Sequence, residues 1–158
     1  MSSELYLKIV IVGHHNYGSP LFENHKFEIM QWIHFHFHTF QVWDVGGQEH
    51  IRDLWKHYYD NEEMDGVLFV VDATDENRLK QAKCALQIIL SGLSSKNSFI
   101  CILANKQDKF SKLLPLSLIM EEMDLNNVLK NRKWKLFQVS ATTGSGLEDV
   151  LKWIMAIE

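Results

Sequence analysis

The sequence predicts an α/β protein with a mostly parallel central sheet flanked by helices, and two observations carry this prediction. Short apolar runs rich in Val, Ile and Phe are typical of buried strands. Segments with helical spacing separate these runs, so strands and helices alternate, which indicates βαβ units and a sheet covered on both faces. The predicted strands span residues 6–12, 40–44, 67–71, 99–104 and 136–139.

Two segments carry the helical spacing. Their apolar residues recur at steps of three and four, which places them on one face against the sheet. We expect Thr74 and Asp75 to cap the first helix, and a turn at residues 144–146 precedes the second. The first stripe contains Leu79, Ala82, Leu86, Ile89 and Leu90, and the second contains Leu147, Val150, Leu151 and Ile154.

Composition narrows the class of protein. The 158 residues include 16 Lys and Arg against 20 Asp and Glu, without a basic block, which argues against nucleic-acid binding. Two cysteines in apolar surroundings, Cys84 and Cys101, favour a reducing compartment over a disulfide framework. The longest apolar run, residues 67–71, is far shorter than the roughly 18 residues of a membrane span. We therefore expect one monomeric, cytoplasmic domain over residues 1–158.

Polar motifs follow three predicted strands, at the end where parallel sheets bind ligands. Residues 43–48 read Trp-Asp-Val-Gly-Gly-Gln, and the two glycines let the backbone approach a phosphate closely. Residues 104–108 read Ala-Asn-Lys-Gln-Asp, and the carboxylate can accept both N1–H and the exocyclic amine of guanine. Adenine offers no such donor pair, so the motif predicts guanine specificity. Residues 140–142 read Ser-Ala-Thr and can present backbone amides to the guanine carbonyl oxygen.

These motifs resemble the guanine-nucleotide-binding elements of small GTPases, and residues 43–48 are similar to the variant found in the Arf and Arf-like (ADP-ribosylation factor) family. Residues 40–59 resemble the family's second switch, residues 66–72 its central strand, and residues 140–154 the entry to its terminal helix. The resemblance implies the P-loop NTPase small-GTPase fold with GTP/GDP and Mg²⁺ as cofactors. It also implies a guanine-nucleotide-dependent switch in vesicle trafficking or signalling, with effector or regulator proteins as partners.

On the base side, the resemblance implies that Asn105 and Asp108 hold guanine and that Lys106 lies along the sugar and base. Taken singly, each residue also fits a solvated loop, but three motifs in the right order make a chance match negligible. The pocket would be completed by Ser140, Ala141 and Thr142.

On the phosphate side, the resemblance implies that Asp44 holds a magnesium-bound water and that Gly47 donates its amide to the γ-phosphate. Gln48 would be the catalytic residue, because it would orient the attacking water. Hydrolysis of GTP is the activity that these roles imply.

The phosphate loop departs from the family pattern Gly-x-x-x-x-Gly-Lys-Ser/Thr. Gly13 and Gly18 are retained as nucleotide-binding candidates, but Ser19 replaces the lysine and Pro20 replaces the magnesium-binding hydroxyl. Losing one charge-assisted contact costs roughly 1.5 to 3 kcal/mol, or on the order of 10 to 150-fold in affinity. The Ser19 hydroxyl reaching magnesium in a shifted register is the alternative. We expect slow turnover.

The first-switch region is short, because only 24 residues separate Gly18 from Trp43. Either a helix spans residues 20–32, or residues 27–43 form a hairpin and the first helix shrinks to a turn. Neither alternative leaves a complete switch, and Thr39 is expected to be a strand residue. An unusual splice form or exon boundary over residues 18–38 is a further interpretation.

All eight histidines lie at or before His57. If residues 34–38 form one strand, His34, His36 and His38 project from one face, where they form either a zinc or nickel site or, as we favour, a solvated strand face. His14 and His15 offer a weak positive charge to phosphates.

No lipid-anchor motif is visible. Ser2 follows Met1 where the Arf family has its myristoylated glycine, and the chain ends without a prenylation cysteine, so we expect no intrinsic lipid anchor.

A hypothesis from another class is a pseudo-GTPase scaffold that binds proteins without cycling. Its interface anchors would be Trp43, Trp55, Tyr58 and Tyr59.

Overall fold

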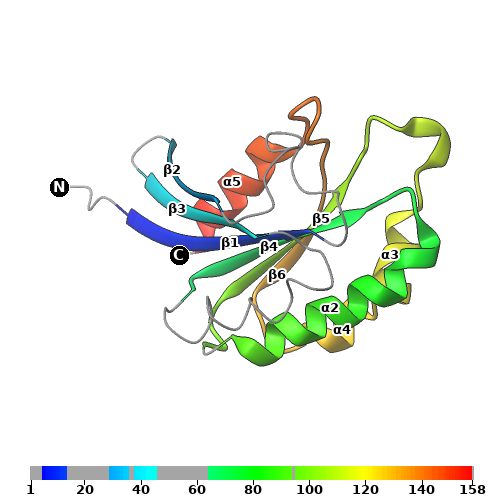
Figure 1. Cartoon of the computed structure of the whole chain (residues 1–158), viewed down its shortest axis with the longest axis horizontal. Helices are drawn as coiled ribbons and strands as arrows, with labels where there is room; N and C mark the ends of the chain where they lie inside the picture. The colour runs from blue at the N-terminus through cyan, green and yellow to red at the C-terminus, as the bar shows by residue number, and fades with distance from the viewer. Residues whose placement is uncertain (1–4, 14–28, 36–37, 46–63, 94, 158) are drawn as a thin grey trace.

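The computed structural model describes a six-stranded sheet covered by helices (Figure 1). The described residues are 5–13, 29–35, 38–45, 64–93 and 95–157. The strands follow the order β2-β3-β1-β4-β5-β6 across the sheet. Their bounds are β1 (Leu5–Gly13), β2 (Ile29–Phe35), β3 (His38–Val45), β4 (Gly66–Asp72), β5 (Phe99–Asn105) and β6 (Trp134–Gln138).

Every neighbouring pair of strands is parallel except β2 and β3, which are antiparallel. The predicted parallel sheet is thus confirmed, and β1, β3, β4, β5 and β6 all end at the same edge. At that edge Gly13 lies opposite Val70, and Asp72 lies opposite Asn105. Loops that follow these strands therefore meet in one place.

The β2–β3 hairpin resolves the two alternatives for the short first-switch region. Strand β2 pairs with β3 from Ile29 opposite Asp44 to Phe35 opposite His38, so the strand pairing of the hairpin alternative is confirmed and a helix over residues 20–32 is wrong. The physical reason is that this apolar segment extends the sheet ladder beside β3. The expected shrinking of the first helix to a turn falls on residues that lie outside the described ones. The interpretation of residues 34–38 as one strand is also wrong, because β2 ends at Phe35 and β3 begins at His38. His36, His14 and His15 lie outside the described residues.

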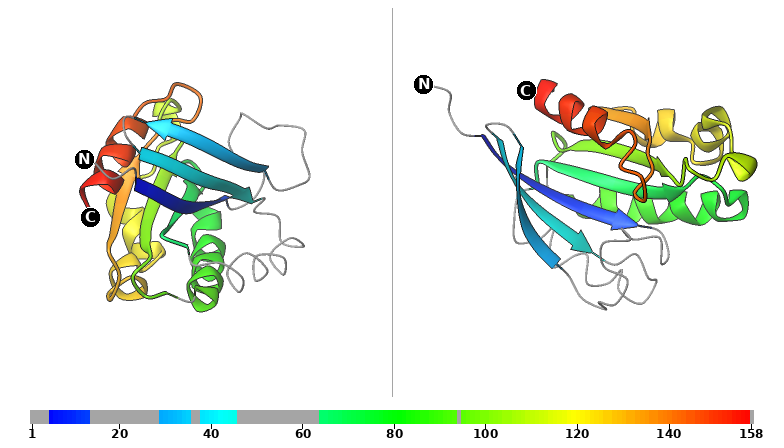
Figure 2. Two further views of the ribbon diagram at one scale, coloured as in Figure 1. Left: turned by 90° about the vertical axis from the view of Figure 1, so that its left-hand side faces the viewer. Right: turned by 90° about the horizontal axis from the view of Figure 1, so that it is seen from above.

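Helices cover both faces of the sheet, as predicted. Helices α2, α3 and α4 lie on one face and α5 lies on the other (Figure 2). Sequence reasoning identified α2 and α5 but missed the short α3 and α4. The bounds are α2 (Leu79–Gly92), α3 (Leu116–Glu122), α4 (Leu125–Val128) and α5 (Leu147–Ala156).

The two faces of β5 divide the apolar core. All seven residues of β5 are buried, and they alternate between two clusters: Ile100 and Ile102 face α2 and α3, whereas Cys101 and Leu103 face α5. Cys84 is exposed rather than apolar in its surroundings, because it lies on the solvent side of α2.

The predicted helical stripes hold with three exceptions, Leu90, Leu147 and Leu151, and Leu151 is half-buried. Leu79, Ala82, Leu86 and Ile89 are buried, but Leu90 is half-buried. In α5, Val150 and Ile154 are buried, whereas Leu147 in the first turn is 37% exposed.

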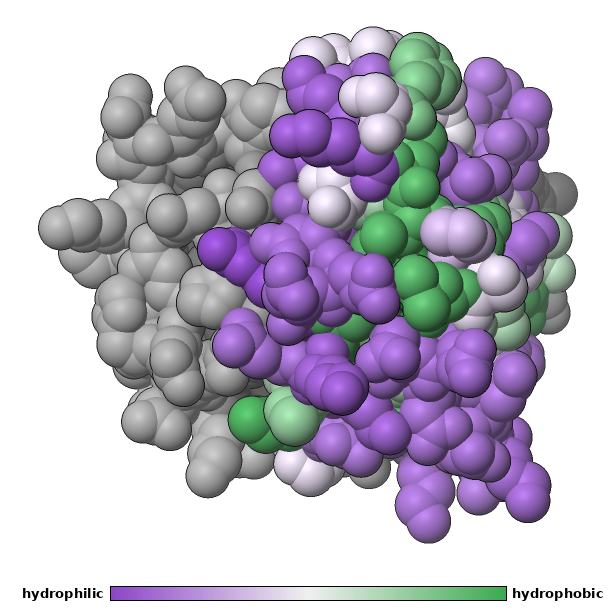
Figure 3. Space-filling view, turned by 90° about the vertical axis from the view of Figure 1, so that its right-hand side faces the viewer, coloured by the Kyte–Doolittle hydropathy of each residue, from purple (hydrophilic) through white to green (hydrophobic). Residues whose placement is uncertain are grey.

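On the face at the right of Figure 1, apolar side chains form a strip among hydrophilic ones (Figure 3). No helix in the described part of the chain combines the length and apolarity that a membrane span requires.

Candidate functional site

The end of β5 and the loop that follows it carry the predicted base-binding residues Asn105, Lys106 and Asp108. Asn105 is the last residue of β5 and is buried, and its carbonyl oxygen accepts a hydrogen bond from Ala73 N at 3.1 Å. Lys106 then adopts a left-handed backbone conformation with φ 70°, which turns the chain sharply out of the strand. The turn is closed by Lys109 N donating to Lys106 O at 2.9 Å.

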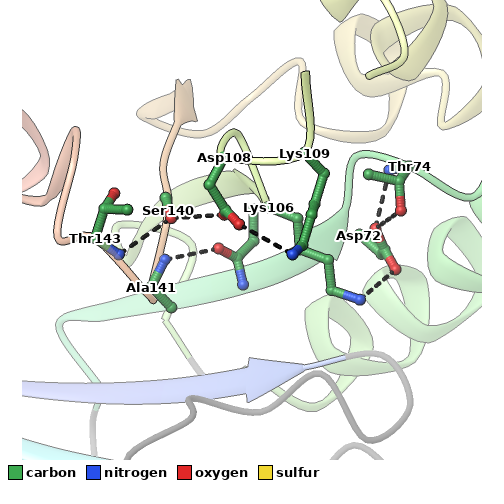
Figure 4. A network of polar contacts seen from close by, with 9 residues as sticks. Asp72, Thr74, Lys106, Asp108, Lys109, Ser140, Ala141 and Thr143 are labelled. Carbon is green, nitrogen blue, oxygen red and sulfur yellow. Dashed lines mark hydrogen bonds and ion pairs between the residues drawn. The ribbon is translucent and has the colours of Figure 1, made fainter. Parts of the chain in front are cut away.

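The loop after β6 meets this turn through side-chain contacts (Figure 4). The Ser140 hydroxyl donates to Asp108 Oδ1 at 2.7 Å, and Ala141 N donates to Asn105 Oδ1 at 2.9 Å. The structure therefore brings together four residues that the sequence placed in one pocket: Asn105, Asp108, Ser140 and Ala141. Thr142 lies in the same loop with an exposed side chain.

Backbone contacts hold the loop 140–146 in place. Gly144 N donates to Ser140 O at 2.8 Å, and Ser140 N donates to Ser145 O at 3.0 Å. Gly146 has φ 79°, and a Cβ there would overlap the carbonyl oxygen of Gln138, so this position requires glycine. The two loops are further joined where Gln107 N donates to Val139 O at 3.2 Å.

Asp72 is a site residue that sequence reasoning missed. It ends β4 beside Asn105, with Oδ2 3.0 Å from Lys106 Nζ (Figure 4). Its other oxygen, Oδ1, accepts hydrogen bonds from Thr74 N at 2.9 Å and from Thr74 Oγ1 at 2.7 Å. The available signal was a carboxylate directly after the apolar run 67–71, at the end of a strand where ligands bind.

The same contact corrects the predicted helix cap. The Thr74 hydroxyl donates to Asp72, and Asp75 precedes a short 3₁₀ turn, Glu76–Arg78, without a side-chain cap hydrogen bond. Asp75 instead pairs with Arg78, with 3.1 Å between Oδ2 and Nε. Helix α2 then begins at Leu79, so Thr74 lies outside the helix and contacts Asp72 instead.

Hydrogen bonds favour the ionised form of two carboxylates at this edge, Asp72 and Asp108. The hydrogen bond from Ser140 lowers the pKa of Asp108 below its ordinary value of 3.8. Burial raises the pKa of Asp72, but the hydrogen bonds from Thr74 and Lys106 outweigh burial, and the net pKa lies below 3.8. An ionised carboxylate only accepts hydrogen bonds, so Asp108 is suited to a ligand that presents N–H groups.

The phosphate side is described only in part. Gly13 is the last residue of β1, and Asp44 is the half-buried penultimate residue of β3, so both lie at the edge where β5 ends. The predicted phosphate and catalytic residues Gly18, Ser19, Gly47 and Gln48 lie outside the described residues. Among the residues that are described, no three His, Cys, Asp or Glu side chains gather as a metal cluster.

The aromatic anchors of the scaffold hypothesis are also described only in part. Trp43 is half-buried and packs against the core on the α2 side of the sheet. Trp55, Tyr58 and Tyr59 lie outside the described residues. Within the described part of the chain, the large apolar residues that stand exposed are Ile88, Phe110 and Leu147.

Comparison with known proteins identifies the family. The sequence profile of the ADP-ribosylation factor family matches residues 24–157. The chain belongs to the Arf family. Its fold is similar to that of the Arl6 BBS3 small GTPase from Trypanosoma brucei, which was solved with the nucleotide analogue GppNp bound. The two share 24% sequence identity with a TM-score of 0.79, and the match covers 95% of each chain. The predicted small-GTPase fold is thereby confirmed for this Arf-family chain.

Proposed function

We propose that this Arf-family protein binds guanine nucleotides at the edge formed by the turn 106–109 and the loop 140–146. The observation that carries the proposal is the ionised Asp108 carboxylate, which Ser140 orients at 2.7 Å. A carboxylate has about four lone-pair sites, so one bond from Ser140 leaves capacity for the two N–H groups on the guanine edge. The amide of Asn105 is oriented in the same way by Ala141 N, which supports a second contact to the base.

Selectivity for guanine over adenine follows from the free energy that is lost when hydrogen-bonding groups are left without a partner. Adenine would set its ring nitrogen acceptor against the Asp108 carboxylate, and a buried polar group that loses its partner costs roughly 1 to 3 kcal/mol. The Asp108 side chain is 20% exposed, so water replaces the lost contacts only in part. We expect GDP and GTP to bind and ATP not to bind at the same concentration.

The test is calorimetric titration of the nucleotide-stripped protein with GDP, GTP and ATP, each with and without magnesium. We expect Asp108→Asn to weaken GDP binding by roughly 10 to 150-fold, since it removes a charge-assisted contact worth about 1.5 to 3 kcal/mol. Asp149→Asn removes an exposed carboxylate from the first turn of α5, outside the site, and should leave GDP affinity unchanged. No binding to the wild type at millimolar nucleotide would overturn the proposal and leave the scaffold hypothesis.

The finer role proposed for the chain is a monomeric, cytoplasmic switch in trafficking or signalling that acts through effector or regulator proteins. Asp44, at the end of β3, would be the magnesium-side carboxylate, and magnesium would neutralise phosphate charge when bound. Gln48 would orient the attacking water. Because Ser19 and Pro20 replace the usual phosphate-loop lysine and hydroxyl, the proposed switch holds its phosphates weakly and turns over slowly.

A further inference from the structure

We infer that Asp72 is a positioning residue of the nucleotide site, which holds the Lys106 ammonium so that the lysine stem lies where the base and ribose would bind. The inference rests on the proposed guanine-nucleotide binding and adds a residue to it. Asp72 itself would not touch the nucleotide, because its role is exerted through Lys106.

The Asp72 carboxylate has one fixed orientation. Asp72 is 7% exposed and lies opposite Asn105 in the parallel ladder between β4 and β5. Both the amide and the hydroxyl of Thr74 donate to Oδ1, which leaves Oδ2 directed at Lys106 Nζ, 3.0 Å away. The next residue, Ala73, is itself tied to Asn105 O, so the end of β4 cannot move independently of the base-binding turn.

Lys106 is consequently held at both ends of its side chain. Its backbone is set by the left-handed conformation with φ 70° and by the hydrogen bond from Lys109 N, and its ammonium is set by Asp72. The side chain is only 29% exposed, which is low for a lysine. A lysine free to rotate would lose many rotamers on binding, whereas this one is ordered before the ligand arrives.

The ion pair also determines what Lys106 contributes. The charge of the Lys106 ammonium is balanced by an ionised Asp72. The lysine therefore acts mainly through packing of its aliphatic stem against the base and ribose, and less through electrostatic attraction to the phosphates. Loss of Asp72 should therefore weaken GDP and GTP by the same factor. If Lys106 instead served the phosphates, freeing its charge would strengthen GTP binding more than GDP binding.

The experiment is a double-mutant cycle with the full chain, measured by calorimetric titration with GDP and GTP. We expect Asp72→Asn to weaken both nucleotides roughly tenfold when Lys106 is present, and less than about twofold in a Lys106→Met background. Asparagine keeps an acceptor for Thr74, so the strand end should stay folded. Asp75→Asn, which alters a carboxylate paired with Arg78 outside the site, is the matched control and should leave affinity unchanged.

Equal losses in both backgrounds would overturn the inference, because Asp72 would then act on the fold and not through Lys106. An unchanged or increased affinity of Asp72→Asn would overturn it as well. A measurement without nucleotide separates failure of this inference from failure of the proposed function. In the nucleotide-free protein, the Lys106 ammonium should give a slowly exchanging NMR signal that Asp72→Asn abolishes. If that signal behaves as expected but the wild type binds no GDP, the ion pair stands and both the proposed function and the positioning role are overturned.

Discussion

At Asp108 the main partner of the carboxylate is the hydroxyl of Ser140, a residue 32 positions later in the chain. Lys109 is adjacent, but its ammonium is 3.6 Å away and its side chain is 64% exposed, so water screens that pair. The contact with Ser140 both orients the carboxylate and keeps it charged. Sequence reasoning found both residues but assigned Ser140 only to backbone contacts, because a side-chain pairing between two loops depends on how the strands are placed side by side.

The contact predicts how stability depends on pH. Because the pKa of Asp108 is lower in the folded chain than the ordinary 3.8, its ionised form stabilises the fold above that pH. This contribution is lost as the pH falls through the lowered folded pKa. Asp108→Asn has no charge at any pH, so we expect its melting temperature to lie below the wild type at about pH 7 and the difference to shrink below about pH 3.8.

Thermal unfolding of the wild type and Asp108→Asn across this pH range is the measurement. The control is the same pair in a Ser140→Ala background, where the difference at neutral pH should be smaller because the hydroxyl donor is gone. A difference in melting temperature that stays constant down to the lowest pH would show that the charge of Asp108 does not stabilise the fold.

At the scale of elements, the sequence predicted most strands and the long helices well but missed the short helices and the start of α2. The five predicted strands match β1, β3, β4, β5 and β6 to within two residues at each end. The reason is that a run of β-branched residues bounded by polar residues strongly favours a strand. The short helices α3 and α4 were missed, since a helix of one or two turns has too few residues to show a period. The cap of α2 was wrong because the 3₁₀ turn Glu76–Arg78 separates Thr74 and Asp75 from the first residue of the helix, Leu79.

The loop between β6 and α5 yields a prediction with a built-in control. Gly144 and Gly146 have the same positive φ, 78° and 79°, but only Gly146 faces a backbone oxygen that a Cβ would overlap. We expect Gly144→Ala to cost about 1 to 2 kcal/mol of unfolding free energy through backbone strain, and Gly146→Ala to cost about 2 to 4 kcal/mol through strain plus overpacking.

Urea unfolding of both variants measures these costs. Because the loop carries Ser140 and Ala141, Gly146→Ala should also weaken GDP binding more than Gly144→Ala does. Equal costs for the two substitutions would mean that the carbonyl oxygen of Gln138 moves aside and that the loop does not require glycine at position 146.

At the scale of the whole molecule, the parallel topology brings the two halves of the proposed nucleotide site together. Gly13 ends β1 and Asp44 lies near the end of β3, while Asn105 ends β5 two strands away from β1. Strands that run the same way deliver their following loops to one edge. The base half and the phosphate half therefore share an edge even though the sequence separates Gly13 from Asn105 by most of the chain.

This arrangement predicts that the phosphate half can be repaired without touching the base half. We expect the double substitution Ser19→Lys with Pro20→Thr to raise GTP affinity by roughly 10 to 150-fold, since a charge-assisted contact is restored. Titration with GTP and measurement of phosphate release give the two readouts. Tighter binding without faster hydrolysis would place the remaining defect in the short first switch, and no change in affinity would contradict the predicted role of this loop.

The sequence by itself determined the strand and helix pattern, the guanine-type motif at residues 104–108 and the departure at Ser19 and Pro20, because these depend on neighbouring residues and local period. Only the tertiary structure decided the hairpin of β2 with β3, the pairing of Asp108 with Ser140 and the contact of Asp72 with Lys106. Each of these three pairings joins residues that are distant in sequence, or residues for which more than one partner is available. Which contact forms then depends on strand order, register and burial, and these properties exist only once the sheet has assembled.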